Sequence, residues 1–243
     1  MTVADGKTRG VVWVAGVGSS AGLGAAVARR FAKEGLVAAV TGRTPERIEA
    51  VAHEIRDGGG DARAFAGDVS REVDLFAMAE RVSALGPLRV AVFNAAGAVR
   101  APSPEISASA LEDVLRTNTV GGFVFGREVV RRFLPLQRGT LLFTGAAASV
   151  RGRPPFAAFA ASKAALRSVS RTLARDFGPR GIHVAHVAID GGINGERPRS
   201  RAPGVDHGGL LALNDIADVY WHLHAQPRSA WTQELDLRSA DPR

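Results

Sequence analysis

Short apolar runs alternate along the chain with amphipathic stretches of helical length. In residues 22–34, Leu23, Val27 and Phe31 recur at every fourth position, which places them on one face of a helix. The apolar runs are too short for helices and are typical of strands that are buried on both faces. The predicted strands are 11–15, 36–41, 62–66, 89–93, 140–144 and 182–189, and the predicted helices are 22–34, 45–56, 71–85, 110–133 and 155–177.

This alternation predicts an α/β fold with a doubly wound parallel sheet, helices on both faces and right-handed crossovers. The chain has 243 residues, 46% of them hydrophobic, and no linker rich in Pro, Gly or Ser divides it. We therefore expect a single domain over residues 1–243. The long irregular stretch 191–208 is predicted to be a lid or substrate loop. It carries Arg197, Arg199 and Arg201, which could bind an anion or be solvated.

Composition argues against several classes of protein. There is no cysteine, so neither disulfides nor Cys-ligated zinc are available. His183 and His186 are three apart on a predicted strand and should face opposite sides, so no metal site is expected. The formal charge is +7, yet the arginines are dispersed and aromatic residues make up only 6%, which argues against nucleic-acid binding. No apolar run reaches membrane-spanning length and no signal peptide is evident, so we expect a cytoplasmic protein.

A glycine-rich turn lies between the first predicted strand and the first predicted helix. Glycines there permit a tight turn and close approach of a pyrophosphate to backbone N–H groups at the helix N-terminus. The position at the head of a βαβ unit makes a dinucleotide-binding turn the leading interpretation. Its candidate binding residues are Gly16, Gly18, Ser19, Gly22, Leu23 and Gly24.

The same turn permits a second interpretation. The stretch from Gly18 to Gly22 matches the G-x-S-x-G nucleophile elbow, with Ser20 as nucleophile and Asp190 and His207 as later partners of a serine hydrolase. That elbow normally follows several strands, whereas this one follows the first, so hydrolysis is a remote alternative.

The end of the second predicted strand bears on cofactor choice. Arg43 stands where an acidic residue would accept a ribose 2′-hydroxyl. A guanidinium suits a 2′-phosphate, which favours NADP(H) over NAD(H). A solvated arginine remains the alternative.

The glycine turn is followed along the chain by further motifs, Asp68-Val69, Asn94-Ala95-Ala96-Gly97, Asn118 and Phe159-x-x-x-Lys163. With these motifs the chain resembles the short-chain dehydrogenase/reductase family over nearly its whole length. The resemblance implies a Rossmann-type fold, a nicotinamide cofactor, a small-molecule substrate, and a homodimer or homotetramer built on the helices 110–133 and 155–177. It also implies roles for single positions. Asp68 and Val69 match the adenine contact, and Asn94, Ala96 and Gly97 match the turn after the fourth strand. Asn118 matches the helix asparagine, Lys163 the ribose-binding lysine and Ile193 the carboxamide contact.

Two catalytic positions depart from the family pattern. In that family a tyrosine protonates the substrate oxygen and a serine hydrogen-bonds the same oxygen. The matching positions here are Phe159 and Ala146, and the only tyrosine, Tyr220, is expected to pack elsewhere. Ser149, Arg151 and Arg153 follow the fifth predicted strand and could face the pocket, although an arginine donates hydrogen bonds rather than a proton.

The sequence therefore leaves three functions open. The leading one is an NADP(H)-dependent oxidoreductase with a non-standard active site that retains Asn118 and Lys163. The second is a catalytically inactive dinucleotide-binding sensor or scaffold. The third is the serine hydrolase based on Ser20.

Overall fold

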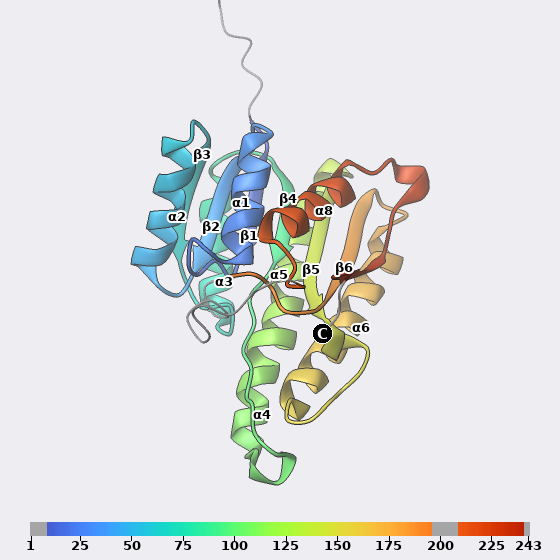
Figure 1. The fold of residues 1–243 in the computed structure, drawn as a ribbon. Helices are drawn as coiled ribbons and strands as arrows, with labels where there is room; N and C mark the ends of the chain where they lie inside the picture. Colours follow the sequence, from blue (N-terminus) through green and yellow to red (C-terminus); the bar gives the residue numbers. More distant parts are fainter. Residues whose placement is uncertain (1–8, 196–208, 241–243) are drawn as a thin grey trace, which may run out of the picture.

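The computed structural model describes residues 9–195 and 209–240, and it contains a seven-stranded parallel sheet (Figure 1). The strand order is β3-β2-β1-β4-β5-β6-β7, so the direction of winding reverses between β1 and β4. Every neighbouring pair runs parallel. The strands are β1 Val11–Ala15, β2 Val37–Gly42, β3 Asp61–Ala66, β4 Leu88–Phe93, β5 Gly139–Ala146, β6 Ile182–Asp190 and β7 Glu234–Arg238.

Helices cover both faces of this sheet. One hydrophobic core lies between the sheet and α1, α2 and α8, and a second lies between the sheet and α3, α5 and α6. The helices are α1 Leu23–Lys33, α2 Pro45–Asp57, α3 Glu72–Ser83, α4 Ala108–Leu115, α5 Gly121–Phe133, α6 Ala157–Phe177 and α8 Leu213–Ala225. The predicted doubly wound α/β architecture is confirmed.

The alternation of side chains along each strand explains why two cores are needed. In β1, the side chain of Trp13 enters the core beside α5, where its ring lies 4.5 Å from that of Phe125. Its neighbours Val12 and Val14 enter the opposite core. All five residues of β1 are fully buried, as expected for a central strand covered on both faces.

Three elements differ from the sequence prediction. Helix α8 lies outside the predicted helix ranges. The edge strand β7 was not predicted, because its residues alternate between exposed and half-buried and form no apolar run. The predicted helix 110–133 comprises α4, a π-helical turn Arg116–Val120 and α5. The π turn contains Asn118, and such turns inside helices are frequent at functional sites. Figure 1 shows that α4 projects beyond the sheet.

Candidate active site

The turn between β1 and α1 requires glycine at one position and is tightly packed at a second. Gly16 has a φ of 87°, and a Cβ there would lie 2.3 Å from the backbone nitrogen of Ala95. A Cβ on Gly24 would lie 3.0 Å from the side-chain nitrogen of Asn94. Gly18 is different, because no described atom lies within 4 Å of the place where its Cβ would be. The turn therefore leaves open space beside Gly18.

The helix that follows this turn begins without a side-chain cap. Gly22 is its N-cap residue, and no side chain accepts a hydrogen bond there from the first N–H groups. The hydroxyl of Ser19 instead accepts from the backbone nitrogen of Ala21, at 3.2 Å. Unsatisfied N–H groups and the positive end of the helix dipole favour an anion. An uncapped helix start beside open space fits the pyrophosphate of a dinucleotide.

The carboxyl end of β2 lies against the same turn. Thr41 accepts hydrogen bonds from the backbone nitrogens of Gly16 and Val17, both at 2.9 Å. Arg43, two residues further on, is exposed and makes no ion pair or hydrogen bond with any described residue. Its guanidinium is therefore available to a ligand bound at the turn.

The loops after β3 and β4 lie at the same end of the sheet, at the carboxyl ends of their strands. Asp68 accepts a hydrogen bond from the backbone of Ser70 at 2.8 Å, and Val69 is buried against Gly121 at the start of α5. Asn94 donates to the carbonyl oxygen of Gly16 at 3.1 Å. This bond ties the loop after β4, which includes Ala96 and Gly97, to the glycine turn. The predicted cofactor residues before residue 100 thus gather at the carboxyl ends of four neighbouring strands.

Asn118 joins this loop to α6. Its side chain is fully buried and makes three hydrogen bonds. The amide oxygen accepts from the nitrogen of Gly97 at 2.7 Å, and the amide nitrogen donates to Gly97 O at 2.9 Å and to Ser162 Oγ at 2.8 Å. The Ser162 hydroxyl donates in turn to the carbonyl oxygen of Phe159. Asn118 therefore fixes the positions of two segments that border the site.

Lys163 follows Ser162 and is buried inside the protein. Only 2% of the residue is exposed, and its ammonium donates a hydrogen bond of 2.8 Å to the carbonyl oxygen of Thr144 at the end of β5. Burial lowers the pKa of Lys163 to about 8. The ammonium lies 5.8 Å from the centre of the Phe159 ring. A buried cation is thus held directly behind the residue at the tyrosine position.

A cavity of about 610 Å³ adjoins these residues, and both Ala146 and Phe159 line it. Neither residue has a polar side-chain atom. Tyr220, the only tyrosine of the chain, is fully buried in α8 and hydrogen-bonds Thr144 Oγ1 at 2.8 Å. Burial raises the pKa of its phenol. The tyrosine therefore packs in the core, as expected, and does not line this cavity.

The three polar residues after β5 have different surroundings. Arg151 and Arg153 line the cavity, as the sequence suggested they could. Ser149 does not: it is 3% exposed, and its hydroxyl accepts a hydrogen bond of 3.1 Å from the backbone nitrogen of Ala146. The Ser149 hydroxyl thus binds the backbone of Ala146, a residue that lines the cavity, and does not face the cavity itself.

The loop after β6 returns to the glycine turn. Ile193 pairs with Leu211 in an isolated parallel bridge, which closes the base of the predicted substrate loop 191–208. Gly195 comes so close to the turn that a Cβ on it would lie 2.9 Å from the carbonyl oxygen of Ala21. Residues 196–208, with Arg197, Arg199, Arg201 and His207, lie outside the described residues.

The hydrolase interpretation finds no support in the surroundings of Ser20. Its hydroxyl donates to Glu54 at 2.5 Å and accepts from Arg29 at 3.2 Å, and no described imidazole contacts it. Asp190 is bound by arginines, with Arg151 at 2.8 Å and Arg238 at 3.1 Å. The one carboxylate that the Ser20 hydroxyl contacts, Glu54, is paired with Arg29 at 3.1 Å, and no described imidazole is within reach to act as the base of a hydrolase triad.

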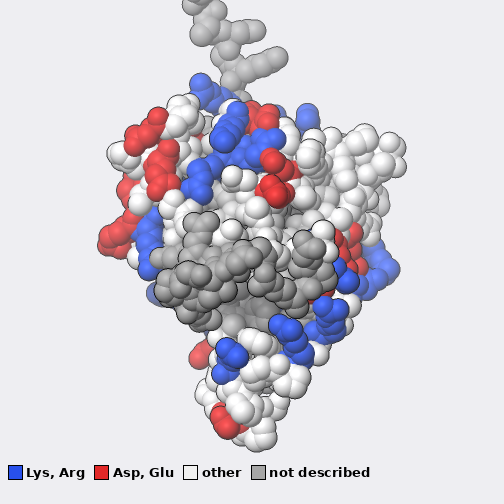
Figure 2. All heavy atoms as spheres, in the orientation of Figure 1, with Lys and Arg blue, Asp and Glu red and all other residues white. Residues whose placement is uncertain are grey.

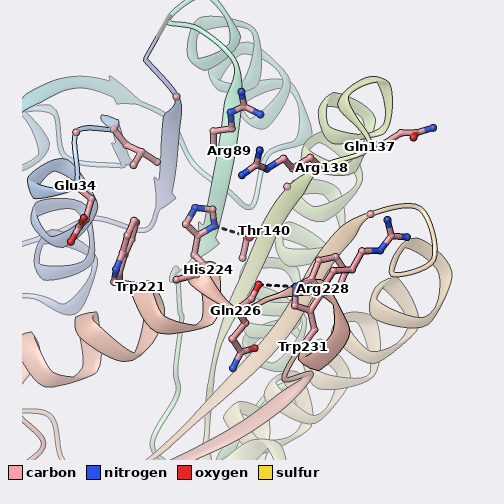
Figure 3. Close-up of a pocket in the computed structure, with 16 residues that line it drawn as sticks. Glu34, Arg89, Gln137, Arg138, Thr140, Trp221, His224, Gln226, Arg228 and Trp231 are labelled. Carbon is pink, nitrogen blue, oxygen red and sulfur yellow. Dashed lines mark hydrogen bonds between the residues drawn. The ribbon is translucent and has the colours of Figure 1, made fainter. Parts of the chain in front are cut away.

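Another cavity, of about 740 Å³, lies at the amino ends of the strands, opposite the glycine turn (Figure 3). Gly10 and Leu36, which precede β1 and β2, line it together with Trp221 and His224 of α8. His224 hydrogen-bonds Thr140 at 2.9 Å, and burial lowers the pKa of its imidazole to about 4. None of the predicted cofactor or catalytic residues lines this cavity.

The described part of the chain has neither a metal-binding cluster nor a membrane-spanning helix. No cluster of three histidine, aspartate or glutamate residues there could hold a metal ion. No helix within the ranges 9–195 and 209–240 is both long enough and apolar enough to cross a bilayer.

Sequence reasoning missed the residues that connect the predicted ones. Ser162 and Thr144 hold Asn118 and Lys163 in place, and Arg238 comes from the unpredicted strand β7. The only sequence signal for Ser162 was its place next to Lys163 in an alanine-rich helix. No local pattern could have predicted that Arg238 reaches Asp190.

Comparison with known proteins agrees with this geometry. The model of the short chain dehydrogenase family matches residues 12–196. Glucose 1-dehydrogenase of Gluconobacter oxydans (strain 621H) is 35% identical over 174 residues, which are 70% of this chain and 65% of that protein, just under two thirds of its length. The crystal structure of a short-chain dehydrogenase from Rhodopseudomonas palustris is 35% identical, with a TM-score of 0.79, over 93% of this chain and 98% of that one.

A further solved structure carries a ligand. It is a metagenomic short-chain oxidoreductase in complex with NADP, which is 26% identical with a TM-score of 0.82, over 96% of this chain and 98% of that one. The family match covers most of the chain, and the fold and the glycine turn agree with it. The chain therefore belongs to the short-chain dehydrogenase family.

Proposed function

We propose that this protein is an NADP(H)-dependent oxidoreductase that acts on a small organic molecule and has a non-standard active site. The cofactor would supply hydride transfer, to or from a carbon atom of the substrate. The uncapped start of α1, the open space beside Gly18 and the exposed Arg43 support NADP(H). The NADP named for the metagenomic relative supports the same choice. NAD(H) is the less favoured alternative.

The residues that would hold the cofactor lie at the carboxyl ends of the strands. The glycine turn would bind the pyrophosphate, and Arg43 would bind the 2′-phosphate. Asp68 and Val69 would contact the adenine. The loop Asn94, Ala96 and Gly97 would border the nicotinamide half, Lys163 would bind its ribose and Ile193 its carboxamide.

The chain's own residues limit the chemistry that the cavity can perform. Asn118 orients the loop after β4 and the start of α6, and Lys163 places an ammonium behind Phe159. Because Ala146 and Phe159 have no acidic hydrogen, the wall cannot protonate a carbonyl oxygen at these positions. A missing general acid reduces the rate by about 10² to 10⁴. Substrates that avoid this loss are already cationic, such as an iminium ion, or develop their charge elsewhere, such as a conjugated alkene.

The observation that carries the proposal is the buried state of Lys163. Burying an ammonium that is 2% exposed costs stability, as its lowered pKa indicates, and this cost favours a role in binding over a purely structural one. The chain carries this cation and the Asn118 contacts beside it although it has neither phenol nor serine at this site. Ribose binding explains why a lysine rather than an arginine stands there.

A catalytically inactive sensor or scaffold is the second candidate. It is favoured by one observation, the apolar wall formed by Ala146 and Phe159 in the cavity. Such a protein would bind NADPH and release it unchanged.

Assembly is a separate part of the proposal. We infer a homodimer or homotetramer built on α4, α5 and α6. Phe123 of α5 and Val120 just before it are 47% and 51% exposed, and Ala161 and Ala164 of α6 are exposed rather than packed against the sheet. A partner subunit would cover this apolar surface.

The test is a turnover assay with NADPH. Purified protein is mixed with NADPH and iminium salts, conjugated ketones or simple ketones. A separate assay uses NADP⁺ with aldose sugars, because a relative is a glucose 1-dehydrogenase. Loss or gain of NADPH absorbance is followed, with Lys163→Met as control. We expect turnover of an iminium or conjugated substrate that the control lacks. NADPH binding without turnover of any substrate would favour the sensor, and failure to bind either cofactor would contradict both.

A further inference from the structure

The cavity beside Ala146 and Phe159 is lined by both apolar and basic residues. Phe156, Ile189 and Leu210 are among the apolar ones. The charged lining consists of three arginines, Arg151, Arg153 and Arg238, and a single carboxylate, Asp190. In Figure 2, basic side chains lie over the segment that joins β5 and α6, which is yellow in Figure 1. The described lining therefore has an excess of positive charge.

Asp190 is already occupied by two of the three arginines. Arg151 Nη2 donates to both of its carboxylate oxygens, at 2.9 and 2.8 Å. Arg238 Nε lies 3.1 Å from the second oxygen. The Asp190 side chain is only 16% exposed, so little of its carboxylate remains open to a ligand. This aspartate cannot also neutralise a third guanidinium.

Arg153 is the arginine that remains. It lines the same cavity, and its side chain makes none of the ion pairs or hydrogen bonds found among residues 9–195 and 209–240. Its backbone lies two residues beyond Arg151, on the loop that leads from β5 to α6. A guanidinium has five N–H donors in a planar fork, which matches the two oxygens of a carboxylate.

The cofactor does not explain this free guanidinium. The residues that would bind phosphates, in the glycine turn and at Arg43, are absent from the described lining of this cavity. The lining instead contains Ala146 and Phe159, which stand at the reacting end of the site. Arg153 therefore faces the space in which a substrate would lie.

We propose that this cavity takes a substrate with a carboxylate at one end and an apolar body, and that Arg153 binds the carboxylate. The inference rests on the proposed function only in calling the ligand a substrate. The apolar body would lie against Phe156 and Leu210, and the volume of about 610 Å³ suits a small organic acid.

The experiment compares two probes of nearly the same shape and different charge, benzoate and benzamide. Their dissociation constants are measured by isothermal titration calorimetry with the full-length protein, once free and once saturated with NADPH. The reduced cofactor is used because its nicotinamide ring carries no positive charge. The variants are Arg153→Gln and, as a control with the same change in net charge, Arg175→Gln. Arg175 is exposed near the end of α6, away from the cavity lining.

We expect the wild type to bind benzoate about tenfold more tightly than benzamide, which corresponds to about 1.4 kcal/mol. The preference should disappear in Arg153→Gln and persist in Arg175→Gln. Equal binding of the two probes, no binding of either at millimolar concentration, or a preference that survives Arg153→Gln would overturn the inference. Failure to bind NADPH would contradict the proposed function alone, because the measurement on the free protein still tests Arg153.

Discussion

Restoring the two missing hydroxyl groups should turn the cavity into a carbonyl-reducing site. The perturbation is the double variant Phe159→Tyr with Ala146→Ser. Both residues line the cavity of about 610 Å³, so the added oxygens enter open space and not the packed core. The cost in stability should be below about 1.5 kcal/mol. The contacts of Asn118 with Gly97 and Ser162 are already in place to support the site.

The expected gain follows from the group that would be added. A positioned general acid contributes about 10² to 10⁴ in rate, which is roughly 3 to 5 kcal/mol of transition-state stabilisation. The ammonium of Lys163 lies 5.8 Å from the ring centre of residue 159 and would lower the pKa of a phenol there. The serine would add a hydrogen bond to the developing oxyanion.

The assay measures NADPH oxidation by an activated 2-oxo ester, with the wild type, each single variant and the double variant. A matched control is Phe156→Tyr with Ala147→Ser, which adds the same two hydroxyl groups to the same cavity at other positions. We expect the wild type and the control to be nearly inert and the double variant to be at least about a hundredfold faster.

Two results would refute this reasoning. If the double variant is folded, binds NADPH and is no faster than the control, then residues 159 and 146 do not border the reacting atom. If the wild type already reduces the ester rapidly, another residue supplies the proton.

Three further predictions concern stability and assembly. Asn118→Ala removes three buried hydrogen bonds, so the free energy of unfolding, measured in urea, should fall by about 3 to 5 kcal/mol. A loss below about 1 kcal/mol would show that these bonds contribute little to stability. Burial lowers the pKa of Lys163 to about 8, so between about pH 8 and pH 10 the unfolded chain binds more protons than the folded protein. Urea titrations should therefore show that the wild type gains stability relative to Lys163→Met as the pH rises through that range. Parallel pH profiles of the two proteins would contradict this. Light scattering at micromolar concentration should show a dimer or tetramer for the wild type and a smaller species for Phe123→Glu, whose parent side chain is 47% exposed; a monomeric wild type would contradict the proposed assembly.

The parts of the fold that could be predicted are those that local pattern determines. The strand β1 is apolar throughout and is followed at once by glycines, so both its burial and the turn after it were evident. The edge strand β7 was not, because an exposed edge needs no apolar run. The π turn at Asn118 was also missed, because it widens a helix by a local change in backbone hydrogen bonding that leaves no hydrophobic signal.

The candidate site was predictable to a similar extent. The positions of Asn118 and Lys163 followed from the family resemblance. In the structure Asn118 bonds Ser162, and the Lys163 ammonium lies 5.8 Å from the ring centre of Phe159, which lines the cavity. The role of Ser149 could not be read from the sequence, because whether a side chain faces a cavity or the backbone behind it depends on a single short turn. The pairing of Asp190 with Arg238 depends on the order of strands in the sheet, which brings β6 and β7 together.

The most direct test of the central claim is a fluorescence titration of NADPH and NADH into the wild type, Arg43→Ala and the control Arg175→Ala. Arg43 is exposed at the end of β2, beside the uncapped start of α1. A hydrogen bond to a charged group is worth about 1.5 to 3 kcal/mol, so NADPH should bind at least about tenfold more tightly than NADH. Arg43→Ala should abolish that preference, and the control should keep it. If neither cofactor binds the wild type, the protein is not a nicotinamide-dependent oxidoreductase.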